Sequence, residues 1–386
     1  MITAENDAGR RRLPLEDLEN QVSSCIGCRM CEEKCPLYLA SRDPGFSPWR
    51  KIEIASRLIK GIDVPLDDLL KAAYGCTLCG ICERACPTGI RITEVVRALR
   101  AMVTQKEKTP AKITRMCSNI IGEGSMIGGG NEFWASWIPE GLSLPEKAEN
   151  IYLVGCMIPF KIPDLGRATL EMLLKAGIDL TILGEEERCC GLLLWEHGLV
   201  EEFRKVAEEN VKKIKRRDAG RVIVSCAACY YAYSEIYPKV IGERIEVKHV
   251  IEVLDELVEA GRLKPRKHLK ERVSYFDACH FTRYTGKYDL PRRLIESIPG
   301  IELVELPRSR EFGYCCGISS GVKLVFKSLA DSVGRMIIDE ARKMGVRKIV
   351  TSCPLCMYQF ASIIEKDNIG GIEAVDLPLL LYRSVD

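Results

Sequence analysis

No segment of this sequence is apolar over the roughly 18 residues that a membrane-spanning helix requires. The first residues, MITAENDAGRRRLPLEDLEN, have no apolar core of the kind that secretory signal peptides contain. The 386 residues carry a formal net charge of +2, without the basic excess typical of nucleic-acid-binding proteins. These absences predict a cytoplasmic protein that binds no nucleic acid, and if it works at a membrane, another subunit must anchor it.

The sequence also lacks the motifs of several large enzyme classes. The glycine-rich segment SMIGGGN (125–131) does not have the G-x-G-x-x-G pattern that follows a strand in dinucleotide-binding folds. We find no convincing Ser–His–Asp arrangement, no phosphate-binding loop and no flavin motif. The chemistry therefore has to come from another residue type.

Cysteine is the residue that the sequence has in excess, with 19 in 386 residues. A secreted disulfide-rich protein would be small and would begin with a signal peptide, which does not describe this sequence. Reduced thiols that bind metal fit a long chain of this composition better. The length predicts two or three domains.

Two N-terminal segments share the pattern C-x2-C-x2-C-x3-C-P, namely CIGCRMCEEKCP and CTLCGICERACP. In this pattern the first three cysteines bind one iron–sulfur cubane, and the cysteine before proline binds the other. The first predicted 4Fe–4S set is Cys25, Cys28, Cys31 and Cys86. The second is Cys35, Cys76, Cys79 and Cys82. Zinc is the alternative, but zinc sites use C-x2-C pairs rather than two runs of four cysteines with terminal prolines.

Apolar residues at helical spacing surround both motifs, in the segments 47–61, 65–75 and 92–103. Residues 1–105 are therefore predicted to form an α-helical ferredoxin-type domain with two 4Fe–4S clusters. Residues 106–150 are rich in glycine, contain prolines and show no clear period, so we interpret them as a connector.

Three residues of the connector need an interpretation of their own. Trp134 and Trp137 are predicted to be packing residues rather than cofactor contacts. Cys117 fits no motif and is predicted to be a small buried hydrophobic residue.

After residue 150 one cysteine pattern occurs twice. Each copy has a single cysteine, then an adjacent pair followed by glycine, then a C-x2-C pair. The intervals are 32 and 35 residues in the first copy and 35 and 36 in the second. The cysteines of the first copy are Cys156, Cys189, Cys190, Cys226 and Cys229. Those of the second copy are Cys279, Cys315, Cys316, Cys353 and Cys356.

Strand-like and helical segments alternate through both copies, which predicts two α/β domains with mostly parallel sheets, 151–265 and 266–386. A cysteine follows four of the predicted strands, NIYLVG, RVIVS, RVSYFDA and VRKIVTS. Ligands of open α/β sheets bind beyond the carboxyl ends of strands, so these cysteines belong where a site is expected. The correspondence between the two copies extends to their C-terminal ends. His249 lies 23 residues past Cys226, and Asp376 lies 23 residues past Cys353.

The adjacent cysteine pairs are each followed by a glycine, Gly191 or Gly317. Glycine permits unusual backbone angles and the close approach of a bulky cluster, so both are candidate cofactor-binding residues. A disulfide within an adjacent pair would be strained, and it would not require three further cysteines in fixed register.

The repeated pattern C-x(31–39)-C-C-x(35–36)-C-x2-C resembles the CCG motif. Together with the ferredoxin motifs, residues 20–380 resemble the D-type chain of heterodisulfide reductase, which is similar to a fusion of a C-type ferredoxin domain and a B-type catalytic domain. The resemblance implies that each set of five cysteines holds a noncubane 4Fe–4S cluster, with one thiolate bridging irons. One departure is that Gly317 is followed by ISSG rather than by a longer glycine run.

The expected function is that of an iron–sulfur oxidoreductase, the catalytic subunit of a heterodisulfide reductase-type complex. It would reduce a small-molecule disulfide, or oxidise two thiols, at paired noncubane clusters fed by two ferredoxin-type clusters. The resemblance implies a b-type cytochrome membrane subunit or a flavoprotein subunit as partner, through which the chain would lie peripherally on the inner face of the membrane.

Four residues outside the cysteine sets are candidates for roles in this chemistry. His280, directly after Cys279, is the candidate proton donor, with a packed histidine as the alternative. His249 is a candidate for lining the cavity from the end of its strand, with a purely structural role as the alternative. Arg283 and Lys287 are candidates for holding an anionic substrate arm, with solvated surface as the alternative.

Two other functions remain open at this point. The chain would be an electron-transfer subunit if the chemistry took place on a separate flavoprotein, as in glycolate, lactate or glycerol-3-phosphate dehydrogenases of the same architecture. It would be a structural protein if the cysteines bound zinc. The residues name neither the disulfide nor the direction of electron flow.

Overall fold

The structure is a computed structural model that describes residues 15–385, so the segment examined for a signal peptide lies largely outside it. The amphipathic segments of the N-terminal lobe form helices, as their spacing predicts, because their apolar residues fall on one face. Leu69 and Ala73 of one helix, for example, are fully buried, as are Val95 and Leu99 of the helix that packs against it. The helices are α1 (Glu19–Ser23), α2 (Pro36–Ser41), α3 (Pro48–Ile59), α4 (Leu66–Tyr74), α5 (Ile81–Arg84) and α6 (Ile92–Gln105).

Each cysteine copy forms its own lobe around a four-stranded sheet, and all strand pairs are parallel, as predicted. The sheet orders are β2-β1-β3-β4 and β6-β5-β7-β8, so the two copies have the same topology. The first sheet contains β1 (Asn150–Leu153), β2 (Leu180–Ile182), β3 (Arg221–Val224) and β4 (Glu246–His249). The second contains β5 (Glu271–Tyr275), β6 (Ile301–Leu303), β7 (Lys348–Thr351) and β8 (Glu373–Asp376).

Helices cover both sheets, whose central strands are apolar and buried. In the first copy these helices are α8 (Ile158–Lys161), α9 (Pro163–Lys175), α10 (Leu192–Glu196), α11 (Val200–Arg216), α12 (Ala227–Tyr231), α13 (Tyr237–Ile241) and α14 (Val250–Glu259). In the second they are α15 (Asp289–Glu296), α16 (Val322–Val325), α17 (Lys327–Lys343), α18 (Pro354–Lys366) and α19 (Leu377–Tyr382). Among residues 15–385, none of the helices combines the length and the apolar character that crossing a membrane requires.

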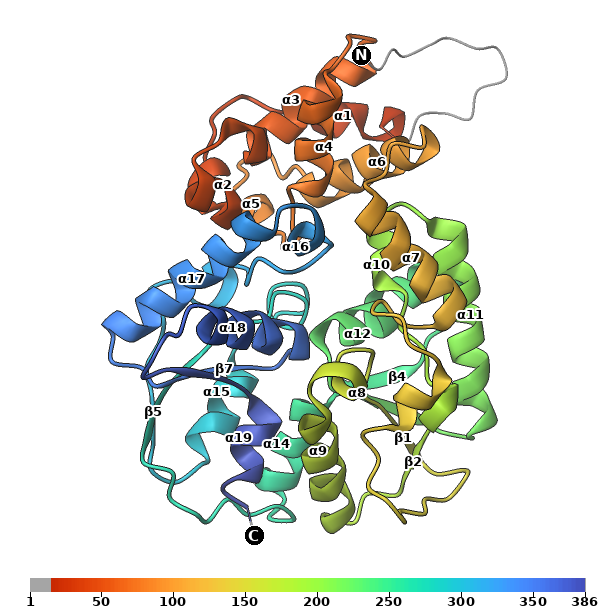
Figure 1. Ribbon diagram of the computed structural model, residues 1–386, viewed down its shortest axis with the longest axis vertical. Helices are drawn as coiled ribbons and strands as arrows, with labels where there is room; N and C mark the ends of the chain where they lie inside the picture. Colours follow the sequence, from red (N-terminus) through yellow and green to blue (C-terminus); the bar gives the residue numbers. More distant parts are fainter. Residues whose placement is uncertain (1–14, 386) are drawn as a thin grey trace.

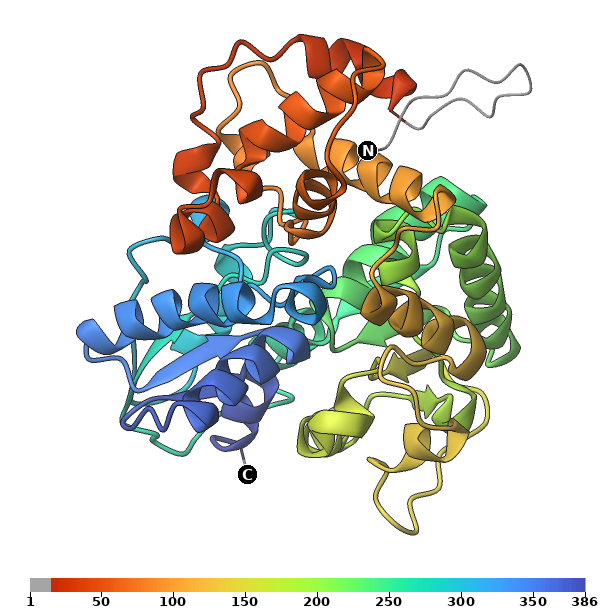
Figure 2. The same cartoon turned by 45° about the horizontal axis from the view of Figure 1, so that its top comes forward.

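The two copies lie side by side, and the helical lobe sits across one end of the pair (Figure 1). Helix α14 of the first copy packs against α15 and α19 of the second, and α19 also packs against α9. Figure 2 shows α6, in orange, running from the helical lobe toward the first copy, while α2 packs against α17 of the second. The helical lobe therefore contacts both copies.

The segment 106–150, predicted to be a connector, contains a helix that the sequence analysis did not predict, α7 (Ala111–Glu123). Its buried residues Ile113, Met116, Cys117 and Ile120 have helical spacing, but the glycines that follow them dominated the composition. Cys117 is buried, in agreement with its predicted role. The helix contacts α10 and α16, so it packs against both copies.

The two connector tryptophans are buried completely and pack as predicted. Trp137 meets Tyr152 of β1 edge-on, with ring centroids 5.8 Å apart. It also lies against Gly166 of α9, where an added Cβ would come within 2.7 Å of the indole ring. The side chain of Trp137 therefore anchors the connector to the first sheet by packing.

This packing predicts that Trp137→Ala lowers the free energy of unfolding by about 3–5 kcal/mol, because it removes a large buried side chain. Urea denaturation followed by circular dichroism measures the loss. Phe133→Ala is the matched control, since Phe133 is 45% exposed and its loss is expected to cost about 1 kcal/mol or less. Equal losses in the two variants would contradict the anchoring role of Trp137.

Candidate functional site

Four of the predicted cysteines lie directly beyond the ends of strands. Cys156 and Cys226 follow β1 and β3, and Cys279 and Cys353 follow β5 and β7. In each sheet these two strands are neighbours, and the connections lead away from them on opposite sides. Each sheet therefore presents two cysteines at its topological switch point, where ligands of open α/β sheets bind.

The five thiols of the first copy form a continuous chain of hydrogen-bonded contacts, and all five are buried. Cys156 contacts Cys189, and Cys189 contacts its neighbour Cys190. Cys190 contacts Cys229, and Cys229 contacts Cys226. The structure therefore brings together all five residues that the first copy of the motif contributes. They form the first CCG set.

The second copy repeats this arrangement and forms the second CCG set. Cys279 contacts Cys315, and Cys315 contacts Cys316. The Sγ atoms of Cys316 and Cys356 are 3.2 Å apart, and Cys356 also contacts Cys353. The order of contacts matches that of the first copy, so the duplication in sequence is also a duplication of the site.

The two CCG sets touch each other through Cys226 and Cys353. The second set is also in contact with the helical lobe, because Cys315 touches Cys79. Thiols from all three lobes therefore meet at one junction. Within the described residues, this contact to a ferredoxin-type cysteine is made by the second set and not by the first.

The cysteines of the helical lobe form two groups, and each group combines cysteines from both ferredoxin-type motifs. One group lines a hollow near the surface and consists of Cys25, Cys28, Cys31 and Cys86. In the other group, Cys35 lies close enough to Cys76 and Cys79 to interact electrostatically with them, and Cys82 is near all three. Cys28 is exposed, whereas Cys35, Cys79 and Cys82 are buried. The first group therefore lies outermost, and the second lies against the second CCG set.

All 19 cysteines are free thiols in the structure. Within residues 15–385, no three His, Cys, Asp or Glu side chains converge as they would around a single metal ion. The thiols of the CCG sets instead form the extended chains described above, each spread over two loops and the start of a helix.

Burial makes most of these thiols hard to ionise. Desolvation raises the pKa of Cys31 and of Cys35 to about 12. Cys189, Cys226 and Cys316 are exceptions, since each accepts hydrogen bonds from other cysteine thiols, which hold its pKa well below the usual value. Bound cations deprotonate thiols outright. A buried, soft donor set of this kind fits an iron–sulfur cluster, which supplies the positive charge that the thiolates lack.

Two glycines shape the backbone beside the adjacent pairs. Gly191 and Gly317 both have positive φ, +76° and +91°. A Cβ on Gly317 would lie 2.6 Å from the carbonyl oxygen of Ala330, so no larger residue fits there. Glycine is therefore needed to turn the chain after each cysteine pair.

His280 is buried against a carboxylate and two aromatic rings. Its Nε2 lies 3.4 Å from Oε1 of Glu196, and its Nδ1 lies 3.7 Å from Sγ of Cys279. Tyr231 and Tyr284 pack on the ring, with centroids 5.4 and 5.5 Å away. Oε2 of Glu196 has no hydrogen-bond partner among the described residues. The imidazole therefore lies between an incompletely satisfied carboxylate and a cysteine of the second set.

His249 and Asp376 occupy matching places at the ends of β4 and β8, and both are fully buried. Burial lowers the pKa of His249 to about 4, which keeps its ring neutral. Burial and the nearby Cys226 thiol raise the pKa of Asp376 well above its usual value. Both side chains therefore place buried polar groups near Cys226, at the junction of the CCG sets.

Arg283 and Lys287, candidates for holding an anionic substrate arm, are both engaged by other groups. The buried guanidinium of Arg283 donates to the carbonyl oxygen of Cys79 at 2.8 Å and to that of Gly313. Lys287 is paired with Glu252. Arg283 therefore joins two lobes rather than lying on a solvated surface, and Lys287 is held by a neighbouring helix.

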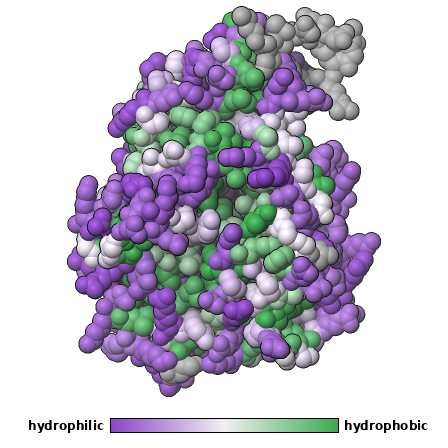
Figure 3. Space-filling view, in the orientation of Figure 1, coloured by the Kyte–Doolittle hydropathy of each residue, from purple (hydrophilic) through white to green (hydrophobic). Residues whose placement is uncertain are grey.

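A pocket of about 410 Å³ lies beside the junction of the CCG sets. Its wall is largely apolar and comes from both copies and from α7. Several wall residues adjoin the cysteine motifs: Met157, Leu193, Ile318, Ser320, Gly321 and Leu355. Figure 3 shows hydrophobic surface in the middle of this face, and α7, α8, α16 and α18 surround it in Figure 1. The ISSG segment after Gly317 is therefore part of a pocket wall.

Basic residues complete the lining of this pocket: Lys112, Arg115, Lys161, Lys323 and Lys327. Sequence reasoning missed all of them. Met157 and Leu355 could have been found from their places beside predicted cysteines. The cations on α7 could not, because that helix was not predicted.

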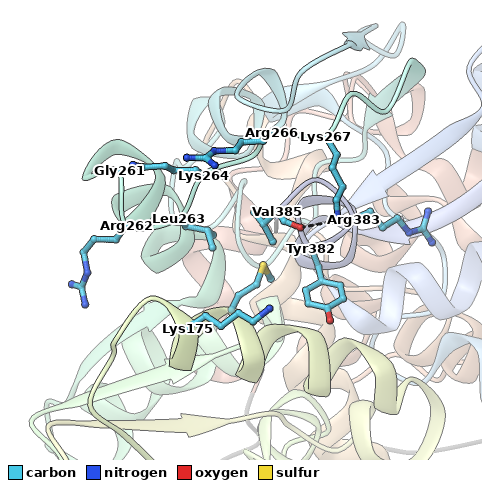
Figure 4. A pocket seen from close by; sticks show the side chains of 11 residues that line it. Lys175, Gly261, Arg262, Leu263, Lys264, Arg266, Lys267, Tyr382, Arg383 and Val385 are labelled. Atoms are coloured by element: carbon cyan, nitrogen blue, oxygen red, sulfur yellow. Dashed lines mark hydrogen bonds between the residues drawn. The ribbon is translucent and has the colours of Figure 1, made fainter.

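A second pocket, of about 660 Å³, lies by α9 and α19, at the end of the molecule away from the helical lobe in Figure 1, and Figure 4 shows it from close by. Its residues come from the end of α9, from 261–267 before β5 and from the end of α19. The first two of these segments lead into the amino ends of β2 and β5, away from the cysteines. Figure 4 shows Lys175 below the pocket and Lys264, Arg266 and Lys267 above it. No cysteine or other predicted site residue lines it.

Comparison with known families agrees with this division of the chain. A family model described as a cysteine-rich domain (CCG) matches residues 151–233 and 273–361. A model described as a 4Fe-4S dicluster domain matches residues 21–90. The predicted combination of a ferredoxin-type region and two CCG domains is therefore confirmed.

Two curated relatives cover nearly the whole chain. The D-type chain of dihydromethanophenazine:CoB--CoM heterodisulfide reductase from Methanosarcina acetivorans is 32% identical over 95% of this chain and 94% of its own length. The B-type chain of fumarate reductase (CoM/CoB) from Methanothermobacter marburgensis is 27% identical over 97% of this chain and 75% of its own length. Both relatives are named as subunits of reductases.

A solved structure of a hypothetical protein from Helicobacter pylori has a similar fold. Its TM-score is 0.59, with 12% sequence identity, over 96% of this chain and 76% of that chain. This likeness concerns the fold alone. The sequence matches carry the family assignment: the chain belongs to the family of the D-type chains of heterodisulfide reductase and is an iron–sulfur oxidoreductase.

Proposed function

We propose that this chain is the catalytic subunit of a heterodisulfide reductase-type complex, which cleaves a disulfide into two thiols or joins two thiols in reverse. The observation that carries the proposal is the contact of two five-thiol sets, through Cys226 and Cys353, beside one pocket. The relative from M. acetivorans supports it, because its name describes a reductase of the CoB–CoM heterodisulfide.

The cofactors that we assign are two cubane 4Fe–4S clusters in the helical lobe and one noncubane 4Fe–4S cluster in each CCG set. The ligands are the 18 cysteines of the four sets, and Cys117 is not among them. When bound, the clusters supply electrons one at a time, and cleaving R–S–S–R′ into two thiols consumes two electrons and two protons. Pairing two equivalent sets at one junction accounts for the duplication.

The pocket residues would hold the substrate and exclude water from it. Met157, Ile318 and Leu355 form apolar wall next to cysteines of both CCG sets. Lys112 and Lys161 are exposed cations at the pocket and would attract a disulfide that carries negative charge. The proposed substrate is therefore a small disulfide with an apolar body and anionic ends.

His280 is the residue that we propose as proton donor to a sulfur of the cleaved disulfide. Glu196 fixes the direction of the ring through Nε2, and Nδ1 faces the sulfur of Cys279. The free oxygen of Glu196 leaves room for a second hydrogen bond, through which a proton can be replaced. The ring is thus oriented by a carboxylate at the edge of the second CCG set.

We further propose that electrons enter from a partner subunit at the outermost cysteine group. Cys28 is exposed there, and Ile26 and Met30 beside it are 69% and 52% exposed. Exposed apolar side chains beside a redox group suit a protein interface. A b-type cytochrome subunit or a flavoprotein subunit is the expected partner.

The direct test is anaerobic turnover of a reduced viologen dye with a panel of disulfides. We expect the iron-loaded protein to oxidise the dye with disulfides, and we expect added thiol to change its electron paramagnetic resonance spectrum. Dithiodiglycolate, with two carboxylates, and uncharged bis(2-hydroxyethyl) disulfide are suitable members of the panel. If no disulfide is reduced and thiols leave the spectrum unchanged, the chain is an electron-relay subunit instead.

Replacing one cysteine of an adjacent pair tests the ligand assignment. With four clusters the protein would hold about 16 iron atoms, and Cys316→Ser is expected to lose or alter one noncubane cluster, or about four of them. Both cubane signals should persist, and disulfide reduction should be abolished. Cys117→Ser is the matched control, since this buried cysteine belongs to no set. Unchanged iron content and activity in Cys316→Ser would refute the assignment.

Charge reversal at the pocket tests the preference for anionic substrates. Lys161→Glu is expected to raise KM for dithiodiglycolate about three- to tenfold, because it replaces attraction by repulsion at an exposed site. KM for bis(2-hydroxyethyl) disulfide should stay constant. Lys264→Glu, at the pocket on the opposite end, is the control and should affect neither substrate. An equal rise for both disulfides in Lys161→Glu would contradict an electrostatic role.

A further inference from the structure

Arg100 is a completely buried arginine at the point where the three lobes meet. It lies on α6 of the helical lobe. A buried guanidinium is costly unless its N–H groups are satisfied, and the five donors of arginine point in fixed directions. A residue of this kind holds its acceptors in a defined geometry. The acceptors of Arg100 come from all three lobes.

Two of these acceptors belong to the helical lobe itself. Nε donates to the carbonyl oxygen of Ala73 at 2.7 Å, and Nη2 donates to the carbonyl oxygen of Cys76 at 2.7 Å. Cys76 opens the second ferredoxin-type motif, and its neighbour Cys79 touches the second CCG set. One side of the guanidinium therefore fixes the loop that begins at Cys76. This loop carries three of the four cysteines of the inner cysteine group, which consists of Cys35, Cys76, Cys79 and Cys82.

The other two acceptors belong to the CCG lobes. Nη1 donates to the carbonyl oxygen of Glu196 at 3.2 Å, in the first copy. It also donates to Oγ of Ser320, in the second copy. Ser320 and its neighbour Gly321 line the apolar pocket. The same guanidinium thus reaches from the inner cysteine loop to the pocket wall.

The backbone of this wall is held in an unusual conformation. Ser320 has φ +57° and Gly321 has φ +78°, both in the left-handed region. Serine adopts this region only at a cost, and such conformations persist where surrounding contacts impose them. A Cβ on Gly321 would lie 2.5 Å from Ile113 of α7 and 3.2 Å from the ring of His197, so the wall is also confined from behind. The hydrogen bond from Arg100 is the polar contact that holds Ser320.

We propose that Arg100 is a positioning residue that couples the inner cysteine loop to the Ser320 wall of the pocket. The wall takes its shape only when the loop that carries Cys76 is in place, and a change in that loop reaches the pocket through one guanidinium. This role deepens the proposed function, because it rests on the pocket being the place where the disulfide binds. The coupling itself is a property of the chain and can be measured without turnover.

Arg283 provides a matched comparison. It is also buried, and it also joins the inner cysteine group to the second copy, through the carbonyl oxygens of Cys79 and Gly313. None of its hydrogen-bond acceptors lines the pocket. Loss of either arginine should disturb the contact between lobes, but loss of Arg100 alone should disturb the wall.

The test is hydrogen exchange of the iron-loaded protein, read by mass spectrometry over residues 318–324. Arg100→Lys keeps the charge but cannot reach all four acceptors, and it is expected to speed exchange of this wall about tenfold, as the loss of a charge-assisted hydrogen bond implies. Ser320→Ala removes the acceptor alone and should have a similar effect. The double variant should exchange no faster than Arg100→Lys, because both changes break the same contact. Arg283→Lys should leave the wall at the wild-type rate.

Kinetics then connect the wall to the proposed function. KM for dithiodiglycolate should rise in Arg100→Lys and Ser320→Ala, and it should stay at the wild-type value in Arg283→Lys. The electron paramagnetic resonance signals of the cubane clusters should be unchanged in Ser320→Ala, which does not touch the cysteine loop. Wild-type exchange of residues 318–324 in both Arg100→Lys and Ser320→Ala, or equal acceleration in Arg283→Lys, would overturn the positioning role. Absence of disulfide turnover in the wild-type protein would overturn the proposed function and leave the exchange result standing.

Discussion

The structure depends on the deep burial of its cysteine thiols. Most of them can carry a negative charge only beside a cation. Cys79 of the helical lobe and Cys279 of the second copy are 6% and 5% exposed, and each contacts the thiol of Cys315. Removing a thiolate from water is costly, and bound iron offsets this cost with positive charge. Each lobe delivers its cysteines to the same junction, the sheets at their carboxyl ends and the helical lobe through Cys79. The lobes are arranged around that junction.

Much of this could be predicted from the sequence because the cysteine motifs are visible in the sequence positions alone, without tertiary information. Most of the strands, the mostly parallel sheets and the grouping of the five cysteines in each copy follow from periodicity and from intervals that occur twice. The pocket could not be found in this way, because its wall joins residues from α7, both copies and the ISSG segment. Arg283 and Lys287 show the same limit. The sequence alone does not distinguish a basic residue that binds a substrate from one that donates to a carbonyl group or pairs with a glutamate.

The two copies are alike in sequence, in topology and in their internal thiol contacts, yet their surroundings differ. Within the described residues, the second set adjoins both the helical lobe and the first set, whereas the first set adjoins the second. His280 and the Ser320 wall also belong to the second copy, while Glu196, which contacts both His280 and Arg100, belongs to the first. The duplication produced two sites with the same internal contacts. The helical lobe contacts the thiols of the second site alone among the described residues, so the surroundings of the two sites differ.

The depth of the adjacent cysteine pair also constrains how the protein is matured. In the folded chain Cys79 and Arg283 lie over the second set, and Cys315 and Cys316 present almost no surface to a carrier protein. A preassembled cluster is far larger than any opening that such exposure allows. The proposed noncubane cluster of the second copy would therefore have to be inserted before the helical lobe packs against it, which makes cofactor delivery an early event in biogenesis and lobe closure a late one.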